Sequence, residues 1–245
     1  MKLYAVCCEA VARESYRAAA MSPHAVTISV KDFGLHNEPA NLRAAIQNEI
    51  DRASASGKYD HILLGYGLCS RGTAELVARN VPLVIPRAHD CITFFLGSKE
   101  RYQQEFSGHP GTYYYSAGWV ERKEGEVDQG GFTIVQDAKR EERFKEYVEK
   151  YGEENAAFLM EQENQWLSHY NRAAFIDMGL GDVEFYRSFT QHVAQEHGWS
   201  YEELQGDLRL VDLLFSGNWA PEDFLIVHPG QRTIEDVTSG IISAV

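Results

Sequence analysis

Short apolar runs alternate with amphipathic segments along the first half of the chain. The apolar runs are readable as buried strands and cover residues 3–6, 24–30, 62–65 and 81–85. Segments with helical spacing of apolar residues lie between or after them, at residues 10–20, 39–54, 72–79 and 91–96. This alternation is typical of a parallel β-sheet with covering helices.

The second half of the chain shows the same alternation of strand and helix patterns, but less regularly. Further strands are predicted at residues 112–116, 173–178 and 224–227, and further helices at residues 137–151, 153–170, 183–196 and 208–215. Residues 124–131 predict a polar loop or hairpin. The turn residues at 107–111 predict the connection between the two halves of the chain. We therefore predict an α/β fold of two similar Rossmann-like lobes with parallel sheets and a cleft between them. Residues 1–110 would form the N-terminal lobe, and residues 111–245 would form an acidic C-terminal lobe.

The net charge of −13 is concentrated in the second half of the chain. Residues 1–110 carry a net charge of +1, whereas residues 111–245 carry −14. An acidic surface disfavours nucleic acid as a partner, because binding to phosphates requires a basic face. No apolar run approaches the roughly 18 residues needed to span a membrane, and the N-terminus lacks a secretory pattern. We expect a cytoplasmic protein with neither nucleic acid nor membrane as a partner.

All four cysteines lie in the first 91 residues, and each follows a predicted strand. Cys7 and Cys8 end the first run, Cys69 follows the third, and Cys91 follows the fourth. Because the carboxyl ends of parallel strands meet at one edge of the sheet, these thiols can converge although they are far apart in sequence. In a chain without a secretory signal, such cysteines are more often thiols or metal ligands than disulfides.

His89 and Cys91 form an H-x-C pair that can reach one tetrahedral zinc ion. Cys69 and Cys8 would complete a set of one nitrogen and three sulfur ligands. With only three of them engaged, the open position would accept water or a substrate thiol. Iron, or an iron–sulfur cluster with three Cys ligands and one His ligand, is the alternative metal. The competing interpretation is that Cys69 and Cys91 are small buried hydrophobic residues.

Two further positions near this edge leave alternatives open. Adjacent strand residues point to opposite faces, so we favour Cys8 as the ligand and assign Cys7 to the core. His36 precedes a predicted helix and is either a ligand or substrate contact, or a solvent-exposed loop residue.

The loop that follows the third strand carries candidate anion-binding residues. Gly65 and Gly67 would let the backbone approach a ligand, although the pattern around them is not a dinucleotide-binding fingerprint. Arg71 and Arg87 flank the cysteines and would lower thiol pKa values or bind a carboxylate or phosphate. Pairing with a surface acid is the alternative for both. Trp119 could help to wall a flat ligand, although a core position is the commoner role.

Two motifs, Tyr-Gly-Leu-Cys at residues 66–69 and His-Asp-Cys at residues 89–91, carry a family resemblance. With the segments at 35–37, 96–98 and 111–114, they resemble the domain-of-unknown-function family 1638 over most of the chain. Members of that family are often encoded beside corrinoid-dependent methylamine methyltransferases. The resemblance implies an association with one-carbon or methylamine metabolism.

The H-x-C pair is also similar to that of zinc methyltransferases, which pass a methyl group from a corrinoid protein to a thiol. These observations together predict a metal-binding protein acting in methyl transfer, with Cys8, Cys69, His89 and Cys91 as zinc or iron ligands. A corrinoid protein or methyltransferase would be its macromolecular partner, and a thiol or methylated amine its small-molecule partner. The alternative is a non-catalytic chaperone or sensor that holds a corrinoid, haem or metal.

Overall fold

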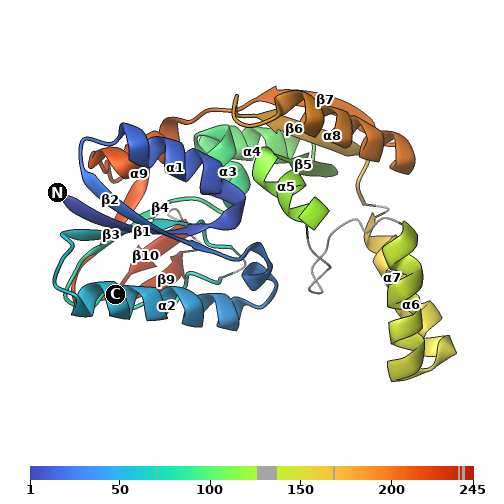
Figure 1. Cartoon of the computed structure of the whole chain (residues 1–245), viewed down its shortest axis with the longest axis horizontal. Helices are drawn as coiled ribbons and strands as arrows, with labels where there is room; N and C mark the ends of the chain where they lie inside the picture. Colours follow the sequence, from blue (N-terminus) through green and yellow to red (C-terminus); the bar gives the residue numbers. More distant parts are fainter. Residues whose placement is uncertain (70, 126–136, 168, 237, 239–240) are drawn as a thin grey trace.

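The fold is mixed α/β, as the alternating pattern predicts. The computed structural model spans residues 1–245 and describes all of them except 70, 126–136, 168, 237 and 239–240. The described strands form a five-stranded sheet, a three-stranded sheet and a two-stranded hairpin (Figure 1). The predicted loop at 124–131 lies mostly outside the described residues.

The five-stranded sheet has the order β2-β1-β3-β4-β8. Its strands are β1 (Lys2–Cys8), β2 (Ala25–Lys31), β3 (His61–Gly65), β4 (Leu83–Pro86) and β8 (Phe224–Val227). The first four are parallel, and β8 pairs antiparallel with β4 at the edge. One face is covered by α1 (Ala12–Met21) and α9 (Arg209–Ser216). The other is covered by α2 (Pro39–Ala55) and by the hairpin of β9 (Thr233–Asp236) and β10 (Ile241–Ala244) (Figure 1).

Burial on both faces explains why these strands read as continuous apolar runs. All residues of β1 after Lys2 are buried, and so are all four residues of β4. On α2, Leu42, Ile46 and Ile50 form the stripe that faces the sheet, and each is fully buried. Each such side chain contributes about 1.5–3 kcal/mol by leaving water, which holds α2 on the sheet.

The second sheet is parallel throughout, with the order β5-β6-β7. Its strands are β5 (Thr112–Tyr115), β6 (Arg172–Asp177) and β7 (Ser200–Gln205). The helices around it are α3 (Cys91–Leu96), α4 (Lys99–Gly108), α5 (Ala117–Gly125) and α8 (Val183–His197). Two more helices, α6 (Asp137–Tyr151) and α7 (Glu153–Leu167), pack on each other and project away from both sheets (Figure 1).

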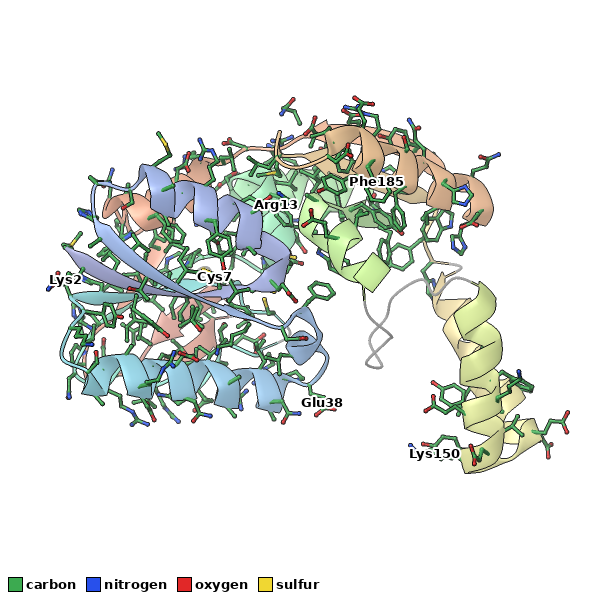
Figure 2. The ribbon with its side chains drawn as sticks, in the orientation of Figure 1. Lys2, Cys7, Arg13, Glu38, Lys150 and Phe185 are labelled. Carbon is green, nitrogen blue, oxygen red and sulfur yellow. The ribbon has the colours of Figure 1, made fainter. Side chains whose placement is uncertain are left out.

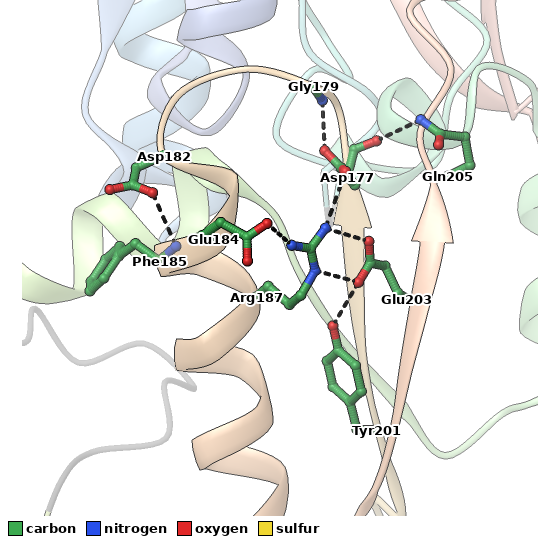
Figure 3. A network of polar contacts seen from close by, with 9 residues as sticks. All are labelled: Asp177, Gly179, Asp182, Glu184, Phe185, Arg187, Tyr201, Glu203 and Gln205. Carbon is green, nitrogen blue, oxygen red and sulfur yellow. Dashed lines mark hydrogen bonds and ion pairs between the residues drawn. The ribbon is translucent and has the colours of Figure 1, made fainter.

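A charged network fixes the connection between β6 and α8 (Figure 3). The Nε of Arg187 donates to Glu203 of β7 at 2.6 Å, and the same guanidinium pairs with Glu184 and lies 3.8 Å from Asp177. Asp177 in turn accepts from the Gly179 amide at 2.7 Å. Asp182 caps α8 by accepting from the Phe185 amide at 3.1 Å. These contacts hold the β6–α8 turn in one conformation.

The helix predicted at residues 72–79 is wrong. Residues 71–75 form turns, and Val77 after them forms an isolated antiparallel bridge with Arg232, the residue before β9. Side chains outside the segment satisfy its backbone: Arg43 donates to the Ala74 carbonyl at 2.6 Å, and Thr233 accepts from the Leu76 amide at 2.9 Å. These long-range partners replace the bonds that a helix would make within the segment.

The chain also returns to its first sheet after residue 206, which differs from the predicted division at residue 110. Helix α9 packs on α1, and β8 joins the edge of the five-stranded sheet beside β4. The three-stranded sheet is therefore an insertion between β4 and β8, not the second half of the chain. None of the helices described for this protein combines the length and the apolar character that crossing a lipid bilayer requires.

Candidate functional site

Three thiols lie at the carboxyl edge of the five-stranded sheet, after neighbouring strands. Cys8 ends β1, Cys69 follows β3, and Cys91 begins α3 after β4. The strand order in the sheet is β2-β1-β3-β4. The chain continues from β1 to β2 on one side of β1, and then crosses to β3 on the other side of β1. Loops diverge at such a reversal, and ligands of open α/β sheets bind there. Cys8 and Cys69 flank this reversal, and Cys91 lies one strand further.

The adjacent residue Cys7 points away from this group. Its thiol makes a hydrogen bond with Ser15 of α1, and it packs against Gly65, where an added Cβ would lie 2.6 Å from the sulfur (Figure 2). Strand alternation therefore turns Cys8 to the opposite face of the sheet. The preference for Cys8 over Cys7 as the site residue agrees with this geometry.

Backbone contacts bring the loops after β3 and β4 together. The Leu68 amide donates to the Ala88 carbonyl at 2.8 Å, and the Cys69 amide donates to the His89 carbonyl at 2.9 Å. Gly67 makes this approach possible, because a Cβ there would lie 2.7 Å from the Asp90 nitrogen. Cys69 has φ of 46°, a left-handed conformation that costs a residue with a side chain on the order of 1–3 kcal/mol. The surrounding structure therefore holds Cys69 in place against local strain.

Cys8 is buried, whereas Cys69 and Cys91 are partly exposed. Cys8 is 9% exposed, and burial raises its pKa to about 12. Burial also raises the pKa of Cys69 and Cys91, and nearby charges add to this effect. Asp90 is one of these charged groups for both thiols. The protein alone therefore keeps the thiols protonated near pH 7, and a cation placed among them would favour their ionisation.

Asp90 makes several hydrogen bonds next to Cys91. Its carboxylate caps α3 by accepting from the amides of Ile92 at 2.9 Å and Thr93 at 3.4 Å, and it accepts from the Tyr102 hydroxyl at 3.2 Å. Burial raises the pKa of Asp90 in spite of these bonds. The Asp90 carboxyl group contributes to the raised pKa of both Cys69 and Cys91.

Residues from outside the first sheet cover the thiols. The indole Nε1 of Trp119, on α5, donates to the Cys91 sulfur at 3.5 Å. The ring of Phe33 meets the Trp119 ring edge-on, with centroids 4.6 Å apart. Because α5 follows β5, the second sheet contributes directly to the surroundings of Cys91.

The side chains do not form a closed coordination shell. Within the described part of the chain, no three His, Cys, Asp or Glu side chains are arranged to hold a metal ion. The three thiols thus lie at one edge of the sheet without being arranged as a metal site.

His89 is the nitrogen ligand of the predicted set, a role that stays a prediction. Its side chain is exposed, and its ring stacks on Tyr102 with centroids 5.4 Å apart. In the turn between β4 and α3, the side chains of Asp90 and Cys91 point inward, because Asp90 caps α3. The side chain of His89, one residue before Asp90, therefore points outward. The side chain of His36 lies outside the described residues, although its backbone belongs to the short helix η2 (Phe33–Asn37).

The two arginines expected beside the cysteines also have other partners. Arg71 is exposed and forms an ion pair with Glu235 of β9 at 2.9 Å. Arg87 donates to the carbonyls of Pro221 at 2.9 Å and Ile242 at 2.6 Å, tying β4 to the C-terminal segment. Gly65 and Gly67 likewise serve internal packing, against Cys7 and against Asp90. The structure thus gives structural contacts to four of the five predicted substrate-binding residues, and the side chain of the fifth, His36, lies outside the described residues.

Sequence reasoning missed Tyr66, Tyr102 and the inward orientation of Asp90. The inward orientation of Asp90 could be predicted from its position immediately before a helix, where Asp is a preferred N-cap residue. Tyr66 lies between Gly65 and Gly67 and begins the Tyr-Gly-Leu-Cys motif, but the sequence gives no sign of its burial. Tyr102 belongs to α4, which was not predicted.

The described residues define a mixed α/β protein with three thiols at the carboxyl edge of four parallel strands. The family described as Protein of unknown function (DUF1638) matches residues 30–214. The chain belongs to this family, and the matched span contains Cys69 and Cys91 but begins after Cys8. The chain matches no curated protein and no solved structure.

Proposed function

We propose that this chain is a metal–thiolate protein in which Cys8, Cys69 and Cys91 bind one zinc or iron ion. One observation carries the proposal: Cys8, Cys69 and Cys91 follow three neighbouring parallel strands at the carboxyl edge of one sheet. Thiolate sulfur is the ligand type that zinc and iron–sulfur centres favour. Three protein ligands leave one position for water or a substrate, the pattern of catalytic zinc sites.

The proposed site lies between two lobes. The five-stranded sheet supplies the thiols, and the second sheet supplies Trp119, whose indole donates to Cys91. We assign the two sheets to two Rossmann-like lobes, with the ligand entering the cleft between them. Trp119 and Phe33 would then form the apolar wall of the site.

The reaction we propose is methyl transfer to a thiol within one-carbon metabolism in the cytoplasm, with a corrinoid protein as the methyl carrier. The thiols at the edge of the sheet motivate this choice, because a thiolate-bound metal can activate a second thiol. A bound metal would lower the pKa of the incoming thiol. The substrate sulfur then takes the methyl group, the thiol proton leaves to solvent, and the carrier retains the electron pair of its bond to the methyl carbon.

Metal analysis tests the proposal. Protein purified without oxygen should contain one equivalent of zinc or iron, and the Cys69→Ser/Cys91→Ser double variant should lose it. Cys7→Ser is the matched control, because Cys7 is buried in the same strand but faces α1. A visible absorption band would identify an iron–sulfur cluster in place of a single ion. Metal absent from the wild type, or retained in the double variant, contradicts the proposal.

A further inference from the structure

Strand β2 forms a free edge of the five-stranded sheet. It pairs with β1 on one side, and among the described residues no strand pairs with its other side. Proteins protect such edges with prolines, bulges, charges or very short strands. All seven residues of β2 pair with β1 in one unbroken register, and none is a proline. Its only charged residue, Lys31, pairs with Glu49 of α2. The edge of β2 is thus open to a further strand.

The backbone groups that point out of this edge belong to alternate residues. The Ala25 amide donates to the Met1 carbonyl at 3.1 Å, so the amide and carbonyl of Ala25 face β1. This direction alternates along a strand, and the amides and carbonyls of Val26, Ile28 and Val30 therefore face away from β1. In the described part of the chain, no hydrogen bond reaches these outward groups. A further strand would supply the partners that they lack.

The side chains of the same three outward residues form an apolar row beside α1. Tyr4 lies opposite Thr27 in the β1–β2 register, and its hydroxyl donates to Glu49 of α2 at 2.5 Å. Thr27 therefore lies on the α2 side of the sheet, and alternation places its outward neighbours on the α1 side. Each of these apolar side chains is only partly buried. The row thus leaves apolar surface accessible along the free edge.

Helix α1 adds apolar surface beside this row. It contacts β1 and β2, whereas α9 contacts β3 and β4, and the ion pair of Arg17 with Asp212 marks the side of α1 that faces α9. A helix turns about 100° per residue, which places Ala19 on the opposite side, toward β2. Tyr16 lies three residues before Ala19, next to it on the helix surface, and is 57% exposed. The apolar surface of the edge strand therefore extends onto α1.

Strand β2 is complementary to a second copy of itself in one antiparallel register. Ile28 then faces Ile28 of the second copy across a two-fold axis, and Val26 faces Val30. Every outward amide and carbonyl gains a partner in this register, whereas a shift in either direction leaves some of them unpaired. On the other face of the sheet Thr27 faces Ser29, and such hydroxyl pairs stabilise paired strands. These matched apolar and polar pairs favour a second copy as the partner.

The charge distribution supports the same partner. The second sheet lies beyond the carboxyl ends of the parallel strands, because α5 packs on the short helix η1 (Glu9–Val11) directly after β1 (Figure 1). Antiparallel pairing points the two copies in opposite directions, which places their second sheets at opposite ends. The second sheet belongs to residues 111–245, with a net charge of −14, whereas the contact surface belongs to residues 1–110, with +1. Repulsion between the acidic parts is therefore small in this arrangement.

We propose that this chain forms a two-fold symmetric dimer in which the β2 strands of two copies pair antiparallel and join their five-stranded sheets into one. The contact comprises β2 and the neighbouring side of α1, including Tyr16. Because the copies point in opposite directions, the carboxyl edges that carry the thiols lie on opposite edges of the shared sheet. The dimer depends on the strand edge and is independent of metal binding.

Analytical ultracentrifugation of the full chain tests the dimer. Wild-type protein should sediment with the mass of two chains at micromolar concentration. Ile28→Lys should weaken dimerisation at least about a hundredfold, because two ammonium groups would face each other at the two-fold axis. Gln195→Lys, which adds the same charge at an exposed position of α8, should remain dimeric. A monomeric wild type, or an Ile28→Lys variant that stays dimeric, overturns the proposal.

Cross-linking tests the register and keeps Ile28 in place, so it decides the question if Ile28→Lys does not fold. Thr27 of one copy and Ser29 of the other form a non-hydrogen-bonded pair, with Cα atoms about 4.5 Å apart, within the range of a disulfide. An equal mixture of Thr27→Cys and Ser29→Cys should therefore give cross-linked dimers under mild oxidation. Each variant alone should give no more than wild type, whose four cysteines set the background. Equal cross-linking in the mixture and in the single variants, or none in the mixture, overturns the pairing of the β2 strands.

Discussion

Glu14 on α1 is fully buried, and neither of its carboxylate oxygens has a hydrogen-bond partner in the described structure. Burial is the main cause that raises its pKa to about 7, from an ordinary value of 4.5. Arg13 opposes this shift and Glu121 adds to it, and these two residues pair with each other where α1 meets α5 (Figure 2). Replacing Glu14 by glutamine removes the ionisation and keeps the shape.

The magnitude of the effect follows from the two pKa values. Between about pH 4.5 and pH 7 the native state holds the Glu14 proton more tightly than the unfolded state does, so stability falls as pH rises. One pKa unit corresponds to about 1.4 kcal/mol, and the ionised carboxylate therefore costs about 3 kcal/mol above pH 7. For a chain of this size that equals a loss of roughly 10 °C in melting temperature.

The assay measures the melting temperature of wild type and Glu14→Gln at pH 5 and at pH 8. Other groups titrate equally in both proteins, so the difference between the two pH dependences reports on Glu14. Wild type should lose about 3 kcal/mol more than the variant on going to pH 8. Glu154→Gln removes the same charge from an exposed side chain of α7 and controls for net charge. Identical pH dependences of wild type and Glu14→Gln would refute the reasoning.

Four further substitutions separate structural from functional residues. Gly67→Ala should lower stability by roughly 1–3 kcal/mol and reduce metal content, because its Cβ meets the Asp90 backbone; melting and metal analysis check both. Arg87→Ala should also lower the melting temperature by breaking its bonds to two backbone carbonyls, yet keep full metal content. Trp119→Phe should weaken metal affinity about tenfold in competition with a chelator, since the donor to a ligand sulfur is lost. His89→Ala should leave metal stoichiometry unchanged, because the His89 side chain is exposed. Loss of the metal from this variant would show that His89 is a metal ligand.

The elements predicted from hydrophobic patterning are those whose apolar residues face a core. Strands β1, β3 and β4 are buried on both faces, and α2 carries a regular apolar stripe. Helix α4 was missed because none of its residues is buried and it carries no apolar stripe, although Ser98 caps it by accepting from the Arg101 amide at 3.1 Å. Strand β7 was missed for a related reason: most of its side chains are exposed at the edge of the second sheet.

The site was predictable in its location but not in its orientations. Strand ends gave the positions of Cys8, Cys69 and Cys91, since parallel strands bring their carboxyl ends to one edge. The outward direction of His89 depends on the capping of α3 by Asp90, a local contact that the H-x-C spacing does not reveal. The partners of Arg87 lie more than 130 residues away in sequence. Contacts of that range become visible only in the folded chain.

X-ray absorption at the edge of the bound metal tests the central claim most directly, because it counts the sulfur atoms around the ion. Wild-type protein should show three sulfur neighbours at about 2.3 Å, the length of a zinc–thiolate bond, and one lighter atom at the exchangeable position. Cys91→Ser should show two sulfur neighbours, while Cys7→Ser should keep three. A first shell of oxygen and nitrogen alone, or a sulfur count that Cys91→Ser leaves unchanged, would contradict a metal centre built from Cys8, Cys69 and Cys91.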